Sequence, residues 1–168
     1  WWPVVRDLLA ADGSRAGDVA DDHLAADDPR LDEVMTGIVA ALKRWRWERR
    51  PTAVTWIPSR RNDALLAELA SRIGRIGKLE VAPLLVRVDE RRPQGEVANS
   101  AHKLANVWGA LTVAGVDEEG VLPRGVLPDG PVLVLDDVYD SGWTMTVAAA
   151  LLREAGADAV LPFPLARR

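Results

Sequence analysis

Cysteine is absent from the chain, and so is any long apolar run. Without cysteine, disulfides and thiolate metal sites are excluded, which fits a reducing cytoplasm. No apolar stretch approaches the ~18 residues that span a membrane, and no basic segment followed by an apolar one marks a secretory signal. We therefore expect a soluble, cytoplasmic protein that has no membrane partner.

Neither sign of charge dominates, since 25 acidic and 21 basic residues give a net charge of -4. Nothing global therefore points to nucleic acid, although a local basic patch is compatible with this balance. The 168 residues suit one compact domain with a sizeable core and a small appendage. The chain begins Trp1-Trp2-Pro3 without an initiator methionine, so we expect it to be a piece of something longer.

The most informative stretch covers residues 131–146, PVLVLDDVYDSGWTMT. Residues 132–135 are branched and apolar, too few for a helix, and typical of a strand that is buried on both faces. Two carboxylates, Asp136 and Asp137, follow directly. After a loop that is rich in hydroxyls and glycine, apolar residues recur at helical spacing from Val147. The predicted order is strand, acidic pair, loop and helix.

Such a loop aims backbone N–H groups and hydroxyls at whatever lies at the helix N-terminus, and the helix dipole adds positive potential there. The group that such a loop binds most favourably is a phosphate. The acidic pair would repel that phosphate, so its useful partners are neutral hydroxyls, such as those of ribose, or a metal ion that accompanies the phosphate. The competing interpretation is an acidic turn that only caps a buried strand.

The segment LDDVYDSGWT resembles, position by position, the phosphoribosyl pyrophosphate (PRPP) signature of type I phosphoribosyltransferases. The resemblance implies that Asp136 and Asp137 bind the ribose hydroxyls and a Mg²⁺ ion. It also implies a 5′-phosphate loop that consists of Asp140, Ser141, Gly142, Trp143 and Thr144. Asp140 falls where purine-specific members carry a proposed general base. Trp143 departs from the pattern, because this loop position is usually small or charged.

A second strand, loop and helix precede this unit. Residues 52–57, TAVTWI, predict a buried strand, and Asn62 is expected to cap a helix that ends at Gly74 or Gly77. In the resembling family, the loop after the first core strand holds the pyrophosphate. This loop offers one hydroxyl and two guanidinium groups, from Ser59, Arg60 and Arg61, and Arg60 would stabilise the departing pyrophosphate. The alternative is a surface turn with solvated arginines.

A long amphipathic helix is predicted to begin at Asp28-Pro29 and to end near Trp47, because apolar residues recur there at i, i+3 and i+4. Its tail, RWRWERR over residues 44–50, mixes cations with two indoles and could stack single-stranded bases. The competing interpretation places the arginines at the helix C-terminus, where the dipole favours them, and packs the tryptophans on the sheet.

Three further segments complete the chain. Residues 81–88 are typical of a strand, and a long polar loop follows, with a short helix expected from Asn99-Ser100. In the resembling family the equivalent segment is a flexible flap over the reacting centre. The last strand, residues 159–165, carries Pro162 and Pro164, which place it at a sheet edge.

Strands that alternate with helices predict an α/β fold. We expect a mostly parallel twisted sheet with helices on both faces, similar to type I phosphoribosyltransferases, and a small helical N-terminal extension. The extension would comprise residues 1–50 and the phosphoribosyltransferase-like domain residues 51–168. Ligands of such sheets lie at the carboxyl ends of the strands, so the two loops and the acidic pair should converge on one crevice.

Several segments, including PSR after the first strand and DSGWTMTVAA, resemble the C-terminal phosphoribosyltransferase-like domain of actinobacterial RecQ-family DNA helicases. This resemblance implies an accessory or regulatory domain that binds PRPP or a 5′-phosphoribosyl nucleotide and reaches DNA through its parent DNA-repair helicase. The chain has no G-x-x-x-x-G-K-[ST] motif, so we expect no ATP hydrolysis by it. Two alternatives stay open: an active Mg²⁺-dependent phosphoribosyltransferase that acts on a nucleobase, and a nucleic-acid-binding module.

Overall fold

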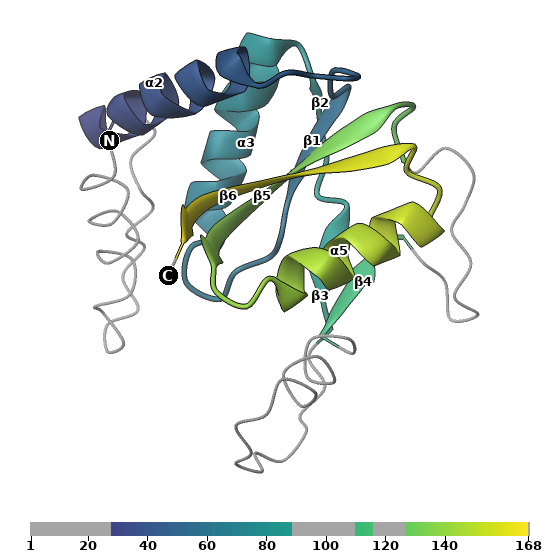
Figure 1. Cartoon of the computed structure of the whole chain (residues 1–168). Helices are drawn as coiled ribbons and strands as arrows, with labels where there is room; N and C mark the ends of the chain where they lie inside the picture. Colours follow the sequence, from purple (N-terminus) through teal and green to yellow (C-terminus); the bar gives the residue numbers. More distant parts are fainter. Residues whose placement is uncertain (1–27, 89–109, 116–126, 168) are drawn as a thin grey trace, which may run out of the picture.

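The computed structural model describes residues 28–88, 110–115 and 127–167 (Figure 1). The elements follow one another in the order α2 (Pro29–Arg44), β1 (Ala53–Trp56), α3 (Asp63–Gly77), β2 (Glu80–Val81), β3 (Leu85–Arg87), β4 (Leu111–Val113), β5 (Pro131–Tyr139), α5 (Trp143–Glu154) and β6 (Ala159–Arg167). The helix expected from Asn99 and the polar loop before it lie outside the described residues. No helix in the described ranges is long and apolar enough to cross a membrane.

Four strands form a parallel sheet in the order β2-β1-β5-β6. β5 lies between β1 and β6, with Leu133 opposite Val54 on one side and opposite Leu161 on the other. β3 and β4 form a separate antiparallel pair. The predicted fold class, a mostly parallel sheet covered by helices, is confirmed.

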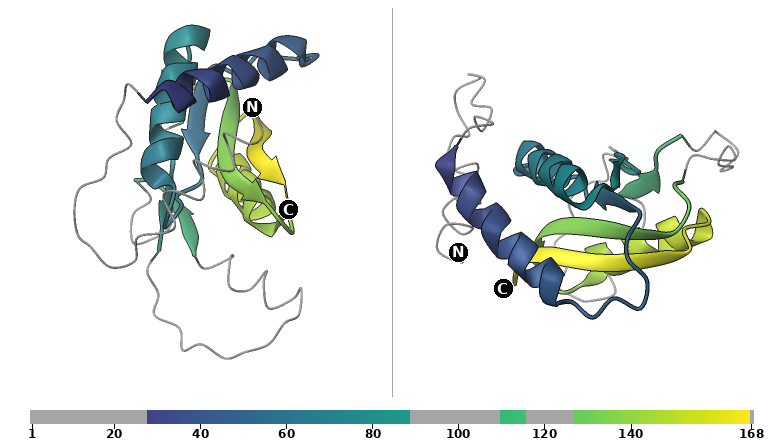
Figure 2. Two further views of the ribbon diagram at one scale, coloured as in Figure 1. Left: turned by 90° about the vertical axis from the view of Figure 1, so that its left-hand side faces the viewer. Right: turned by 90° about the horizontal axis from the view of Figure 1, so that it is seen from above.

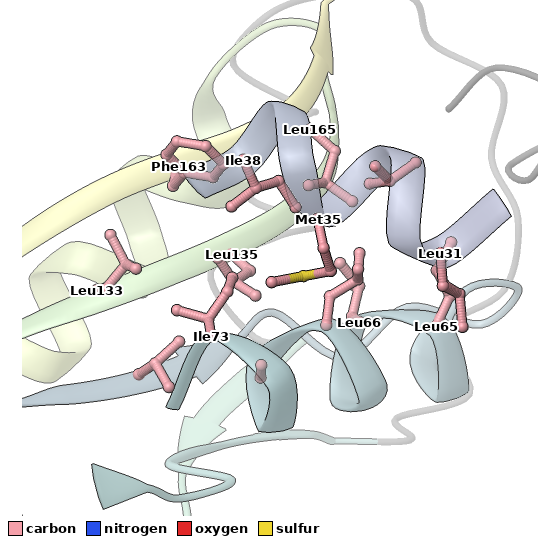
Figure 3. Packing of buried hydrophobic residues seen from close by; sticks show 14 residues of the cluster. Leu31, Met35, Ile38, Leu65, Leu66, Ile73, Leu133, Leu135, Phe163 and Leu165 are labelled. Atoms are coloured by element: carbon pink, nitrogen blue, oxygen red, sulfur yellow. The ribbon is translucent and has the colours of Figure 1, made fainter. Parts of the chain in front are cut away.

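The two faces of this sheet bury two different hydrophobic clusters, because side chains alternate along a strand. Leu133 and Leu135 of β5 face α2 and α3 (Figure 3). Val132 and Val134 face the opposite side, where α5 and the β3–β4 pair cover them. The two views of Figure 2 show α2 and α3 on one side of the sheet and α5 on the other. The run of apolar residues in β5 is therefore buried on both faces, as predicted.

Helix α2 begins where it was predicted to begin. The Asp28 carboxylate accepts a hydrogen bond from the Arg30 N–H at 2.9 Å, and Pro29 occupies the first turn. Leu31 and Ile38, both buried, pack in the same cluster as α3 and β5. This cap and this apolar stripe explain why the sequence was sufficient to locate the helix.

The end of α2 differs from the prediction. The helix stops at Arg44, because Trp45 adopts an extended conformation with φ -67° and ψ 129°. Trp47 donates its Nε1–H to the Leu42 carbonyl at 3.0 Å, which satisfies an acceptor of the last turn. The Trp45 ring stacks on that of Trp47 at a centroid separation of 4.7 Å and lies 6.2 Å from the ring of Phe163 in β6. The tryptophans thus pack on each other and toward the sheet, outside the helix.

Residues 81–88 are not one strand, as the sequence suggested. They contribute to β2 and β3, which belong to different sheets. Pro83 lies between them and has no N–H group to extend the ladder. Leu84 then donates its N–H to the Thr55 Oγ1 at 3.1 Å, and the chain leaves the main sheet to pair with β4.

β5 and β6 both extend further than predicted. Their ladder continues to the pair Tyr139 and Arg167, so the acidic pair lies within β5 and does not follow it. β6 is an edge strand, as predicted, and it passes through Pro162 and Pro164 without a break. Because these prolines are two residues apart, their nitrogen atoms point to the same side, which at a sheet edge needs no donor.

Candidate functional site

The polar side chains singled out in the sequence gather at the carboxyl edge of the parallel sheet. β1 and β5 run side by side to this edge, and the Ile57 N–H still donates to the Leu135 carbonyl at 2.9 Å. The turn that leads into α3 and the turn that leads into α5 therefore start from adjacent positions. The two loops predicted to converge do so at this edge.

The acidic pair of β5 is divided between the two faces of the sheet. Asp137 has the same parity as Leu133 and Leu135, so it turns toward α3. Asp136 has the parity of Val132 and Val134 and turns toward the side of α5. Two neighbours in the sequence thus experience different surroundings.

The Asp137 carboxylate ties the first turn to β5. Its Oδ2 accepts hydrogen bonds from the Ser59 Oγ at 2.8 Å and from the Asn62 Nδ2 at 2.7 Å. Its Oδ1 accepts from the backbone N–H of Val138 at 2.7 Å. Hydrogen bonds to a charged acceptor are stronger than those between neutral groups, so this cluster holds the β1–α3 turn against the end of β5.

The rest of the first turn is satisfied by its own side chains. The Ser59 Oγ accepts from the N–H groups of Arg61 at 3.4 Å and Asn62 at 3.2 Å. The Ser59 N–H and the Trp56 Nε1–H both donate to the Asp63 Oδ1, at 3.3 Å and 3.1 Å. The side chains of Arg60 and Arg61, by contrast, are exposed. The turn thus presents guanidinium groups to a ligand, while its backbone donors are largely engaged.

Arg87 of β3 also holds this turn, which the sequence had not indicated. Its Nη2 donates to the Pro58 carbonyl at 3.0 Å. The link joins the small antiparallel pair to the edge of the main sheet, and it depends on a fold of residues 81–88 that the sequence did not reveal.

Asn62 occupies the N-cap position of α3, as predicted, yet its side chain makes no capping hydrogen bond. It is only 5% exposed, and it donates to Asp137 instead. Within the described residues, its Oδ1 is a buried acceptor that no donor reaches. Sequence reasoning missed Asn62 as a site residue because an asparagine before a helix is most simply interpreted as a cap.

The second turn is built differently. Gly142 adopts a left-handed conformation, φ 79°, at the N-cap of α5, and a Cβ at this position would lie 2.5 Å from the Tyr139 Oη. No side chain caps this helix, and its first turn contains no acid. Asp140 and Ser141 are exposed, whereas the flanking Trp143 and Thr144 are half-buried. Helix α5 therefore starts without a side-chain cap, and the polar residues just before Gly142 face solvent.

Asp136 is a buried carboxyl group, with only 6% of its surface exposed. Burial, reinforced by the negative charge of Asp137, raises the pKa of Asp136 to about 7. Asp136 is therefore only partly ionised near neutral pH. A cation or a hydrogen-bond donor placed beside it would favour the fully ionised form.

The acidic pair can bind a magnesium ion only together with a ligand that supplies further oxygen atoms. Mg²⁺ is usually bound by one or two carboxylates together with substrate phosphates. Among the described residues, no group of three or more His, Cys, Asp or Glu side chains could hold a metal ion. Asp136 and Asp137 leave β5 on opposite sides, but their side chains interact with each other, so both could supply oxygen donors of the type that Mg²⁺ prefers.

A cavity of about 370 Å³ lies at some distance from these groups, between α2, α3 and the sheet. Its walls are mostly apolar, and its charged residues are Lys43 and Arg50. It contains none of the hydroxyl, amide or carboxyl groups described above. We therefore place the candidate site at the carboxyl edge, where the polar chemistry is.

Comparison with known proteins identifies the class of this fold. The arrangement is that of type I phosphoribosyltransferases, as solved structures show. Adenine phosphoribosyltransferase from Saccharomyces cerevisiae is 14% identical, with 100% of this chain and 90% of that chain covered and a TM-score of 0.57. The enzyme from Rhodothermus marinus is 15% identical, with 100% of both chains covered and a TM-score of 0.51.

Other comparisons add less. An allosteric regulatory enzyme of purine biosynthesis is 18% identical with a TM-score of 0.48; 80% of this chain is covered, but the chain spans only 24% of that protein. No family model matches the sequence, and no curated protein does.

Proposed function

We propose that the chain binds PRPP or a 5′-phosphoribosyl nucleotide at the carboxyl edge of its sheet. The observation that carries this proposal is the Asp137 carboxylate, which joins Ser59 and Asn62 to β5 just before the loop into α5. A ribose with a 5′-phosphate needs acceptors for its hydroxyls next to donors for its phosphate. Asp137 supplies the former, and the open N-terminus of α5 supplies the latter.

The 5′-phosphate would lie in the loop of residues 140–144. The left-handed Gly142 lets the backbone turn sharply there, and no acidic side chain of the first turn competes with an anion. Asp140, Ser141 and Thr144 would line the loop, and the half-buried Trp143 would form its wall. The fold that this chain has in common with adenine phosphoribosyltransferases supports the same placement.

A pyrophosphate would lie toward the first turn. Arg60 and Arg61 project from this turn into solvent and would provide cations for it. Mg²⁺ would be held by Asp136 and Asp137 together with ligand oxygens, and when bound it neutralises charge on a departing pyrophosphate.

Calorimetric titration with PRPP and Mg²⁺ tests this proposal. We expect saturable binding that Arg60→Ala weakens and that Arg75→Ala, which removes an exposed arginine at the other end of the same helical unit, leaves unchanged. If the titration showed no heat of binding and the melting temperature did not change at millimolar ligand, the proposal would be wrong.

The biological role that we favour is regulatory, as an accessory domain of a RecQ-family helicase that reaches DNA through its parent chain. Its support is the sequence similarity of DSGWTMTVAA and not the fold. The second candidate is transferase activity, which the exposed Asp140 at the end of β5 supports, because a general base must reach its substrate. Pyrophosphate release that depends on a nucleobase and is lost in Asp140→Ala would establish it, whereas binding without release would favour the regulatory role.

A nucleic-acid-binding role for residues 44–50 receives less support. Trp45 and Trp47 use ring faces to stack on each other, and Arg49 forms an ion pair with Asp158. We expect replacement of both tryptophans by alanine to lower the melting temperature with little effect on binding of single-stranded DNA. A folded double variant that had lost DNA affinity would contradict this expectation.

A further inference from the structure

Asn62 combines two features that a purely structural residue would avoid. It stands at the N-cap of α3, where an asparagine normally turns its oxygen to the N–H groups of the first turn. Its side chain instead donates its Nδ2–H to the Asp137 Oδ2 at 2.7 Å. The amide oxygen is left in a buried position, and no donor among the described residues reaches it.

The helix gains nothing from this orientation. The Asn62 carbonyl oxygen of the main chain accepts from Leu66, while the side-chain oxygen gives no help to the N-terminus. Buried polar atoms are normally paired, and one without a partner is costly. A ligand that brings a donor to this oxygen would remove the cost.

The chemistry of the missing partner can be deduced. Oδ1 is an acceptor only, so a phosphate or pyrophosphate oxygen, which also accepts, cannot pair with it. Asp137 beside it already accepts three hydrogen bonds, and a carboxylate has about four lone-pair positions, so it too has room for one further donor. The Asn62 Oδ1 and the Asp137 carboxylate are two acceptors that lie close together, because the Asn62 Nδ2–H donates to the Asp137 Oδ2 at 2.7 Å. Such a pair of acceptors suits the adjacent hydroxyls of a sugar.

We propose that Asn62 accepts a hydrogen bond from one of the two ring hydroxyls of a bound ribose 5-phosphate group. Asn62 thereby sets a preference for ribose over the deoxyribose that lacks this hydroxyl. The inference rests on the proposed function and adds to it a specificity-determining residue in the first turn, one that also positions Asp137.

The test compares ribose 5-phosphate with its 2-deoxy and 3-deoxy analogues, titrated into the whole chain by calorimetry. For the wild type, loss of the hydroxyl that meets Asn62 should weaken binding on the order of tenfold, because the acceptor is again left unpaired. In Asn62→Ala, the same analogue should bind as well as ribose 5-phosphate does.

Ser59→Ala is the matched control. It removes another donor to the same Asp137 oxygen but keeps the Asn62 acceptor. We expect it to weaken binding of all three sugars alike and to preserve the discrimination between them. If Ser59→Ala abolished the discrimination and Asn62→Ala preserved it, the assignment to Asn62 would be wrong.

The wild type alone can overturn the inference, even if Asn62→Ala does not fold. Equal affinity for ribose 5-phosphate and for both analogues would show that no acceptor at this site forms a hydrogen bond with a ring hydroxyl. This result would leave the proposed function intact. No binding of ribose 5-phosphate at all would also overturn the inference, while the titration with PRPP and Mg²⁺ decides the proposed function separately.

Discussion

The two turns at the carboxyl edge of the sheet have the same order of elements and opposite chemistry. In the turn from β1 to α3, the carboxylate of Asp63 and the hydroxyl of Ser59 accept hydrogen bonds from the N–H groups of the turn itself. In the turn from β5 to α5, Gly142 replaces the capping side chain, and no acid stands in the first turn of the helix. Neither helix has a side-chain cap, but the N–H groups of the first turn are engaged by its own side chains and α3 starts with an acid. We call this turn closed, and we call the other, whose helix starts without an acid, open.

For the proposed ligand, which has a phosphate at each end, this difference assigns one phosphate to each turn. The open turn suits the 5′-phosphate, because backbone N–H groups and a helix dipole converge there. The closed turn can attract a second anion only through the exposed guanidinium groups of Arg60 and Arg61. The carboxylates of β5 lie between the two turns, where the ribose would be.

The largest expected effect concerns Asp136, the carboxyl group that the first turn does not stabilise. Its folded-state pKa is raised from 3.8 to about 7, so the native state binds this proton more tightly than the unfolded chain does. The stabilisation is complete below about pH 4 and is lost as the pH rises through 7, a change of up to about 4 kcal/mol. Asp136→Asn should remove this slope in chelator-treated protein and stabilise it at pH 8. Urea unfolding from pH 5 to 8 measures both, and a stability that rose over this range would refute the assignment.

Gly142→Ala should cause the next largest loss of stability, because it strains the backbone of the open turn. Backbone strain at φ 79° costs up to about 3 kcal/mol, and the new methyl would also meet the Tyr139 hydroxyl. Gly156→Ala is the control, since Gly156 is also left-handed, φ 103°, with nothing within 4 Å of the added Cβ. Thermal unfolding should show the greater loss for Gly142→Ala, and binding of the 5′-phosphate should suffer in this variant only. Equal losses in both would show that the Tyr139 contact is unimportant.

Asp137→Asn probes the link between the two turns. The change replaces a charged acceptor of three hydrogen bonds by a neutral amide, and we expect a loss of about 2 kcal/mol in unfolding free energy. Ribose affinity should fall with it. Urea denaturation and PRPP titration check the two effects. An unchanged affinity would place the carboxylate outside the site.

The smallest effect should come from placing a negative charge in the open turn. Thr144→Glu places a carboxylate in the first turn of α5, where the helix dipole favours it by about 0.5 kcal/mol. Stability should therefore rise slightly, while affinity for the 5′-phosphate falls, because the new anion competes for the same potential. Melting temperature and calorimetry would report opposite signs. A gain in both would mean that the phosphate does not bind at this turn.

The sequence alone was sufficient for the elements whose signals are local. The apolar stripe of α2 and its Asp28 cap, the buried runs of β1 and β5, and the glycine before α5 each depend on residues a few positions apart. The same is true of the turn between β5 and α5, while the binding role predicted for residues 140–144 from their resemblance to the PRPP signature stays a prediction. Local periodicity and turn chemistry carry this information, because they act within one element.

Tertiary structure decided what depends on residues far apart in the chain. The ladder with β6 extended β5 through the acidic pair, so that Asp136 and Asp137 leave the strand on opposite sides. Pairing with β4 divided residues 81–88 between two sheets. The Asn62 side chain does not cap α3 as expected but donates a hydrogen bond to Asp137, which is 75 residues further along the chain. A charged acceptor at the edge of a neighbouring strand outweighs a capping bond, and no window of the sequence contains both partners.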